Sequence, residues 1–316
     1  MKREAEQAGP IIGDSSSIRE ARRLVETYAS SGLPILIVGA TGTGKELLAR
    51  HIHRLSGRSG PWVPVNCSAL PVHVAESLLF GHRRGAFSGA VESRRGYVRG
   101  AHQGNLFLDE VLDLPAEVQP KLLRALDFGE VQPLSEDAPE YVDLRVIAAA
   151  QDNVWTRLEA GTFRHDLFHR LSGIVIQLPP LCARPDDIVP LARHFAAAQG
   201  QALAPGVAAV LLAYAWPGNA RELRLAVERA RAIVPNGSLS AAALAKAIEL
   251  GAPVSALALP SRGIWEDGPR KQLVHTLEMH RWDADRAAAA LGMHRATLFR
   301  HLKTLGLSIR TLRKSQ

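Results

Sequence analysis

The feature that most constrains the fold is a glycine-rich turn that joins an apolar run to a helical stretch. Residues 35–38 are Ile-Leu-Ile-Val, the turn is Gly-Ala-Thr-Gly-Thr-Gly-Lys, and residues 46–55 carry apolar side chains at helical spacing. Glycines let the backbone wrap around a phosphate, amide N–H groups point at it, and the lysine adds positive charge. The sequence therefore predicts a phosphate-binding loop made of Gly39, Ala40, Thr41, Gly42, Thr43, Gly44, Lys45 and Glu46.

One residue of this loop departs from the general pattern. A Ser or Thr usually follows the lysine and offers its hydroxyl to magnesium, whereas Glu46 stands at that position here. The sequence leaves two alternatives: the hydroxyl comes from Thr43, or the site has none.

Two adjacent carboxylates follow a second apolar run. Residues 106–108 are Leu-Phe-Leu, and Asp109 and Glu110 come directly after them. A hard cation prefers oxygen ligands, and a water nucleophile needs a positioned base. We predict that Asp109 binds Mg²⁺, directly or through water, and that Glu110 activates water. Without a phosphate loop upstream, two acids after a strand would be ordinary surface residues.

Apolar runs and amphipathic stretches alternate from residue 11 to about residue 180. This alternation predicts an α/β fold with a parallel sheet covered by helices. Residues 186–250 are rich in Ala and Leu at helical spacing, and residues 251–269 contain three Pro and three Gly. We expect a tail at 1–10, an α/β subdomain at 11–185, a helical lid subdomain at 186–250, a linker at 251–269 and an all-α domain at 270–316.

The net charge of +7 is confined to one end of the chain. Residues 270–316 contain ten Lys and Arg against three Asp and Glu, so the rest of the chain is neutral. Such asymmetry favours a nucleic-acid contact, although a solvated basic tail would give the same count.

Composition excludes several other classes. With 47% hydrophobic and 22% charged residues the chain is typical of globular proteins. No apolar run approaches the length of a membrane span, and the polar start of the chain contains no signal peptide, so we expect a cytoplasmic protein without a membrane partner. Two distant cysteines, Cys67 and Cys182, do not make a disulfide framework.

Eight motifs occur in an order that resembles the AAA+ activators of sigma-54 RNA polymerase, the bacterial enhancer-binding proteins. The motifs are GATGTGKE (39–46), VNCSAL (65–70), ESLLFGH (76–82), GAFSGA (85–90), LFLDE (106–110), GTFRHDLFHRL (161–171), LPPL (178–181) and WPGNARELR (216–224). The resemblance covers roughly residues 11–307 and implies an AAA+ ATPase fold that uses ATP and Mg²⁺.

The resemblance also implies roles for single residues. Arg164 and Arg170 match arginine fingers, which act on the nucleotide of a neighbouring subunit and therefore require a ring of six or seven copies. Arg221 matches a second nucleotide sensor, and we expect Asn219 to be the N-cap of its helix. Asn66 matches the residue that holds the catalytic Glu. At the first sensor the usual Thr-Asn is Ala150-Gln151 here, which predicts slower or less well-coupled hydrolysis.

The motif GAFSGA matches the loop with which the family contacts sigma-54. In this chain the loop comprises Gly85, Ala86, Phe87, Ser88, Gly89 and Ala90. Gly85 and Gly89 permit backbone conformations that other residues avoid, and Phe87 is expected at an exposed tip. Four residues depart from the family here: Ser88 replaces Thr, Leu79 replaces Glu, and a basic pair, Arg83-Arg84, precedes the loop.

The C-terminal segment resembles a Fis-type helix-turn-helix. Its second motif helix would enter the major groove of double-stranded DNA. The side chains that would contact DNA are His294, Arg295, Thr297, Arg300 and His301.

The resemblance implies a homo-oligomeric activator that binds an upstream enhancer and hydrolyses ATP to open closed complexes of sigma-54 RNA polymerase holoenzyme. Because only about ten residues precede the ATPase region, we expect no N-terminal regulatory domain, and control could then come from a separate regulatory protein. The alternative is a DNA-binding regulator of the same fold that no longer remodels sigma-54, such as a repressor or accessory factor.

Overall fold

The structure, a computed structural model, describes residues 9–136, 138–251, 277, 282–284 and 287. By its internal contacts the chain divides into two units, Met1–Gly251 and Ala252–Gln316. The first unit contains all the elements described below. Within the described residues, no helix is both long enough and apolar enough to cross a membrane.

A five-stranded parallel sheet lies at the centre of the first unit. Its strand order is β2-β3-β6-β1-β7. The strands are β2 (Trp62–Asn66), β3 (Asn105–Asp109), β6 (Arg145–Ala150), β1 (Ile35–Val38) and β7 (Ile174–Gln177). The α/β prediction and its parallel sheet are confirmed. A short antiparallel pair, β4 (Glu130–Val131) and β5 (Glu140–Tyr141), lies outside this sheet.

Strand residues alternate between two apolar cores, one on each face of the sheet. In β3, Leu106 and Leu108 pack into one core, whereas Phe107 packs into the other. In β1, Leu36 and Ile37 divide in the same way. This period of two is what a pleated strand covered on both faces requires.

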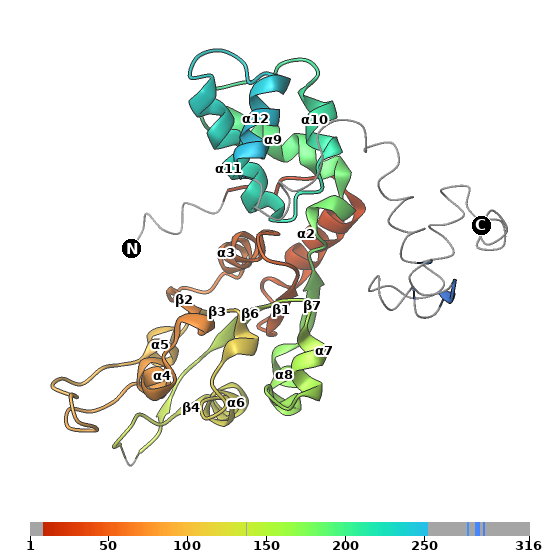
Figure 1. Cartoon of the computed structure of the whole chain (residues 1–316). Coiled ribbons are helices and arrows are strands. Elements are labelled where there is room, and N and C mark those ends of the chain that lie inside the picture. The colour runs from red at the N-terminus through yellow and green to blue at the C-terminus, as the bar shows by residue number, and fades with distance from the viewer. Residues whose placement is uncertain (1–8, 137, 252–276, 278–281, 285–286, 288–316) are drawn as a thin grey trace. The chain divides into compact units, whose positions relative to one another are not determined.

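Helices cover both faces of the sheet (Figure 1). They are α2 (Ser16–Tyr28), α3 (Lys45–Leu55), α4 (Val72–Phe80), α5 (Tyr97–Gly100), α6 (Gln119–Phe128), α7 (Val154–Glu159) and α8 (His165–Leu171), with the 3-10 turns η1 (Cys67–Ala69) and η2 (Val111–Asp113). Ser15 caps α2, since its hydroxyl accepts from Ile18 N at 3.3 Å.

A four-helix lid follows the sheet. After the turns η3 (Leu181–Ala183) and η4 (Pro185–Asp187) it consists of α9 (Ile188–Ala197), α10 (Val207–Ala213), α11 (Asn219–Ile233) and α12 (Ala241–Gly251). Its own apolar core includes Trp216 and Leu223. Figure 1 shows the lid beyond the end of the sheet that carries α3.

The parallel register brings three chain segments to one edge of the sheet. Val38 pairs with Ala150, and Leu108 pairs with Ala148. The residues that follow β1, β3 and β6 are therefore neighbours, because parallel strands all end at the same edge.

Candidate functional site

The phosphate-binding loop joins β1 to α3 where the sequence predicts it. Lys45 is the first residue of α3 and is buried; its Nζ donates to Gly39 O at 2.7 Å and to Ala40 O at 3.3 Å. Gly39 and Gly42 are required by close packing, since a Cβ at either position would lie 2.4 Å from a backbone oxygen, of Leu178 and of Gly218 respectively. The loop and the amino end of α3 thus form the anion site expected of this motif.

Three consecutive carbonyl oxygens of this loop accept hydrogen bonds from the lid and from the turn that leads into it. The bonds are Asn219 Nδ2 to Thr41 O (2.9 Å), Arg221 N to Gly42 O (3.3 Å) and Arg184 Nη2 to Thr43 O (2.9 Å). These donors hold the peptide groups of the loop from the outside, by their carbonyl oxygens.

Asn219 does not act as the N-cap of α11. Gly218 occupies the cap position, and Asn219 is the first residue of the helix, with a φ of 55°. Its side chain is buried and faces away from the helix: Oδ1 accepts from Leu181 N at 2.7 Å, while Nδ2 donates to the loop. The carboxylate of Glu222 satisfies Gly218 N at 2.7 Å instead. The N-cap prediction is therefore wrong, because tertiary partners compete successfully for this amide.

Asp109 is the last residue of β3, and Glu110 follows it, at the edge of the sheet that carries the phosphate loop. Burial, followed by the negative charge of Glu110, raises the pKa of Asp109. A divalent cation would relieve both effects, and the carboxylate oxygens present are the ligands that Mg²⁺ prefers. The donor set therefore fits magnesium.

Two residues bear on which side chain could offer magnesium the hydroxyl that the motif usually has after its lysine. Glu46 is exposed and its carboxylate pairs with Arg50 at 2.9 Å along α3. Thr43 is buried and donates its hydroxyl to Ala40 O at 2.8 Å. The Glu46 carboxylate is thus engaged on the helix surface, and the Thr43 hydroxyl supports the shape of the loop.

Gln151 and Asn66 lie at the ends of β6 and β2, on either side of β3. Gln151 Nε2 donates to Glu110 Oε2 at 3.1 Å. Asn66 Oδ1 instead accepts from Ser68 N at 3.0 Å and from Ser68 Oγ at 2.7 Å, which caps the turn η1. The structure therefore brings Gln151, and not Asn66, into hydrogen bonding with Glu110.

An apolar pocket of about 120 Å³ adjoins the phosphate loop and was not anticipated from the sequence. It is lined by loop residues, by the segment before α2 and by the lid, among them Ile11, Ile12, Leu47, Leu191 and Phe195. A flat heterocyclic base attached to bound phosphates fits such a pocket. The sequence feature that could have indicated this pocket is the apolar pair Ile11-Ile12 ahead of the first helix.

Arg164 precedes α8 at its N-cap position and Arg170 lies on the helix; both side chains are half-exposed, at 49% and 44%. Arg164 forms a two-bond pair with Asp166 and lowers the pKa of that carboxyl to about 2. Arg170 bonds to Asp127 at 3.0 Å and to Leu126 O at 2.6 Å. Because α8 ends just before β7 begins, Arg170 lies near the amino end of this strand, whereas the phosphate loop follows the carboxyl end of the parallel strand β1.

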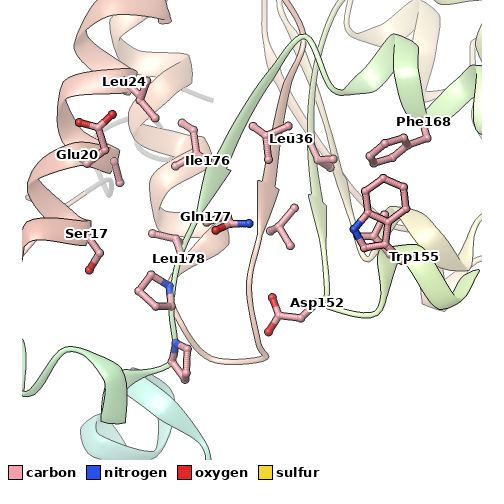
Figure 2. Close-up of a pocket in the computed structure, with 16 residues that line it drawn as sticks. Ser17, Glu20, Leu24, Leu36, Asp152, Trp155, Phe168, Ile176, Gln177 and Leu178 are labelled. Carbon is pink, nitrogen blue, oxygen red and sulfur yellow. The ribbon is translucent and has the colours of Figure 1, made fainter. Parts of the chain in front are cut away.

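A second groove, of about 940 Å³, runs along the edge strand β7 (Figure 2). Figure 2 shows Glu20 and Leu24 of α2 on one side and Trp155 and Phe168 on the other. The two aromatic rings lie 5.9 Å apart, and Trp155 is 66% exposed. Phe168 lies between Arg164 and Arg170 in sequence, so the groove borders the helix that begins after Arg164 and carries Arg170.

The segment 82–94 forms a loop beside residues 132–136, and Figure 1 shows both extending away from the lid. Gly85 and Gly89 have φ values of 83° and 107°, as their predicted role in a tight loop requires. Phe87 is 40% exposed and its ring lies 5.0 Å from that of His82. Arg83 pairs with Glu136 of the neighbouring loop, so this basic departure from the family has an acidic partner.

The predicted DNA-contacting residues His294, Arg295, Thr297, Arg300 and His301 lie outside the described residues. The same holds for most of the predicted linker and C-terminal domain.

Comparison with known proteins identifies the family. The family model described as the sigma-54 interaction domain matches residues 11–177. The chain belongs to the sigma-54 interaction domain family. The model of the AAA+ ATPase lid domain matches residues 183–257. The chain therefore contains an ATP-binding AAA+ domain of the sigma-54 interaction type, followed by its lid.

Curated relatives of this family are longer than the chain. The DNA-binding transcriptional activator HyfR of Escherichia coli is 38% identical over 323 residues, which cover 96% of this chain and 48% of the relative. The anaerobic nitric oxide reductase transcription regulator NorR of Salmonella typhimurium is 42% identical over 320 residues, covering 94% and 63%. The chain thus spans about half to under two thirds of the length of these sigma-54 interaction domain proteins.

Solved structures agree with the assignment. NtrX from Brucella abortus in complex with ATP has a TM-score of 0.72 and 34% identity, over 97% of this chain and 72% of that one. The Holliday junction branch migration motor RuvB of Thermotoga maritima, at 18% identity and a TM-score of 0.52 over 91% and 84% of the two chains, shares the fold alone with the sigma-54 interaction domain.

Proposed function

We propose that the protein is an ATP-dependent transcription activator. It binds upstream enhancer DNA, assembles into a ring and hydrolyses ATP to remodel closed complexes of sigma-54 RNA polymerase holoenzyme into open ones. The observation that carries this proposal is that one subdomain combines two features. A phosphate-binding loop follows β1 at the sheet edge where Asp109 and Glu110 lie, and a second loop exposes Phe87.

For ATP hydrolysis, the proposal assigns each residue of the site a task. Lys45 and the loop amides bind the phosphates, and Asp109 holds Mg²⁺, which supplies charge neutralisation on the phosphate oxygens when it is bound. Glu110 takes the proton of the attacking water, and Arg221 contacts the nucleotide from the lid. The apolar pocket beside Thr43 and Leu47 accommodates the adenine base.

Ring assembly, the second part of the proposal, is argued from the two arginines at α8. Arg170 lies near the end of the sheet opposite to the phosphate loop of its own chain, so it meets phosphate groups of another copy in the proposed ring. Arg164 at the N-cap position of the same helix acts with it. The groove with exposed Trp155 continues this surface and would be covered by the same neighbouring copy.

Remodelling of sigma-54 complexes, the third part of the proposal, is argued from the loop Gly85–Ala90. An exposed aromatic side chain between two glycines in the left-handed region makes a small apolar contact point on an adaptable backbone. Phe87 contacts sigma-54 in this scheme, and Ser88 retains the hydroxyl of the usual Thr. Residues 270–316 bind DNA through the predicted recognition helix, and cytoplasmic localisation follows from this activity.

In vitro transcription from a sigma-54 promoter tests the proposal. The full chain with ATP should give open complexes and transcripts, whereas ATP replaced by a non-hydrolysable analogue should give none. Transcription with the analogue, or none with ATP despite measurable hydrolysis, would refute the proposed function.

A second candidate shares the fold but not the remodelling. Ser88 and the paired Arg83 support a regulator that binds DNA and ATP without opening sigma-54 complexes. Such a protein would occupy its DNA site and yield no open complex in the same assay.

A further inference from the structure

We propose that Gln119 positions Arg164 for the nucleotide of the neighbouring copy, by holding the start of α8 to the start of α6. This inference rests on the proposed function, because it takes Arg164 as an arginine that acts on another copy of the chain. Gln119 contacts no nucleotide in this scheme. It is a positioning residue that acts through Arg164.

Gln119 is a buried polar side chain whose amide is hydrogen-bonded at both ends. It is the first residue of α6 and is 1% exposed. Its Oε1 accepts from Arg164 N at 2.9 Å, and its Nε2 donates to Leu114 O at 3.0 Å and to Thr162 O at 3.1 Å. The partners fix the orientation of the amide, because a carbonyl oxygen only accepts and a backbone N–H only donates.

The bond to Arg164 lies where α8 begins. Arg164 is the N-cap residue of this helix, and its side chain makes no capping bond because it pairs with Asp166. Its backbone N–H is therefore held from outside the helix, by a side chain 45 positions earlier. Further along the helix Arg170 has its own anchors on α6, at Leu126 O and Asp127. A loss of the Gln119 amide thus displaces Arg164 first.

The other end of the amide reaches the segment that follows the acids of the same copy. Leu114 comes directly after η2, and η2 comes directly after Glu110. Leu114 is 3% exposed and belongs to the apolar core that includes Leu106 and Leu108 of β3. Gln119 therefore refers the position of Arg164 to a rigid part of the fold, next to the acid pair of its own copy.

Position matters for an arginine that neutralises charge on a phosphate. A misplacement of about 1 Å in a catalytic arrangement can lower the rate by about a hundredfold. Without the amide, Arg164 N, Leu114 O and Thr162 O lose this shared partner, and the start of α8 is no longer tied to α6 at this point. The rate of hydrolysis in the neighbouring copy should fall, while its affinity for ATP stays the same.

The first test measures ATPase kinetics of the full chain. Gln119→Met keeps the length of the side chain and removes its polar atoms. It should lower kcat by about ten- to hundredfold and leave KM for ATP within about twofold, because the phosphate loop is unchanged. In an Arg164→Ala background the same change should lower kcat by less than about twofold further, since an absent arginine cannot be misplaced.

Gln119→Asn is a second variant in case the apolar side chain prevents folding. Its amide is one carbon–carbon bond, about 1.5 Å, too short to reach the three partners together. It should therefore lower kcat in the same way as Gln119→Met. A kcat within about twofold of the unchanged protein for both variants would overturn the inference.

Gln201→Met is the matched control. Gln201 is likewise a buried glutamine, at 9% exposed, and its Nε2 donates to Val234 O at 2.7 Å. It lies in the lid between α9 and α10, so the identical chemical change falls on helices that carry neither arginine. This variant should melt at a lower temperature and keep its kcat. If it lowers kcat as much as Gln119→Met does, the loss reports general destabilisation and the inference fails.

The second test shows on which copy Gln119 acts. Chains with Arg164→Ala keep their own ATP site, and chains with Lys45→Ala keep their arginine, so a mixture should recover hydrolysis at interfaces that combine the two. Adding Gln119→Met to the Lys45→Ala chain should reduce this recovery by about tenfold or more. Adding it to the Arg164→Ala chain should change the recovery by less than about twofold.

Failure of the inference and failure of the proposed function give different results. An equal or larger loss when Gln119→Met is in the Arg164→Ala chain would overturn the inference, because Gln119 would then support its own ATP site. No recovery in the mixture that has Gln119 unchanged would refute the proposed action of Arg164 on a neighbouring copy, and the inference with it.

Discussion

Asn219 offers the sharpest test of how the lid is joined to the phosphate loop. The change is Asn219→Ala, which removes the acceptor of Leu181 N and the donor to Thr41 O. Leu181 is fully buried, so its N–H would be left without its partner at a cost of about 1–3 kcal/mol. Ala at a φ of 55° adds about 1 kcal/mol, because a Cβ disfavours the left-handed region.

Together these effects predict a loss of about 2–4 kcal/mol in the free energy of unfolding. For a unit of this size such a loss lowers Tm by about 5–15 °C. The assay is thermal and urea unfolding of the nucleotide-free chain, followed by circular dichroism. Asn219→Gly should recover about 1 kcal/mol of the loss, since glycine adopts this φ freely.

Asn219→Asp separates stability from nucleotide binding. Asp can still accept from Leu181 N, but it sets a carboxylate oxygen against Thr41 O. We expect a smaller fall in Tm than with Ala and a fall in ADP affinity of about tenfold or more, measured by calorimetry. An Asn219→Ala protein that melts within about 1 °C of the unchanged one would refute the reasoning.

Three further changes test the rest of the site. Asp109→Asn should abolish Mg²⁺-dependent hydrolysis yet raise the Tm of the nucleotide-free protein, because the raised pKa of Asp109 means that its charge opposes folding at neutral pH. The gain in Tm should shrink as pH falls through that raised pKa, where Asp109 becomes protonated in the folded protein. Arg170→Ala should leave Tm nearly unchanged, since the side chain is half-exposed, and lower kcat by about a hundredfold or more. Phe87→Ala should leave basal ATPase activity intact and abolish open-complex formation.

Each of these has a result that would contradict it. A Tm gain of Asp109→Asn that grows toward low pH would reverse the sign expected for a raised pKa. Mixing Arg170→Ala with an inactive Lys45→Ala chain should restore some hydrolysis at mixed interfaces, and no recovery would argue against a finger supplied by a neighbouring copy. Full transcription by Phe87→Ala would remove the loop from the proposed contact.

Local patterns predicted the part of the site that depends on chain neighbours. The apolar run at 35–38 matches β1, and the helical spacing at 46–55 lies within α3, which begins one residue earlier at Lys45. Asp109 ends a strand and Glu110 follows it as expected, because an apolar run followed by acids marks the point at which a buried strand reaches solvent.

Tertiary competition accounts for what the sequence did not predict. Asn is a common N-cap residue, but the side chain of Asn219 instead hydrogen-bonds to Leu181 N and Thr41 O, which are 38 and 178 residues away. Gln151 is an exposed residue after a strand until the sheet order places it beside Glu110. The pocket lined by Ile11 and Leu191 likewise joins segments with no common sequence signal.

The hydrogen bonds to the carbonyl oxygens of the phosphate loop allow the orientation of the lid to be coupled to nucleotide binding. If a lid orientation that keeps the bonds to Thr41, Gly42 and Thr43 tightens nucleotide binding tenfold, nucleotide must favour that orientation by the same factor, about 1.4 kcal/mol. Under that condition, a load that rotates the lid would weaken phosphate binding, and loss of phosphate would make the lid easier to rotate. Force applied by a remodelled partner would reach the rate of product release through these three backbone oxygens.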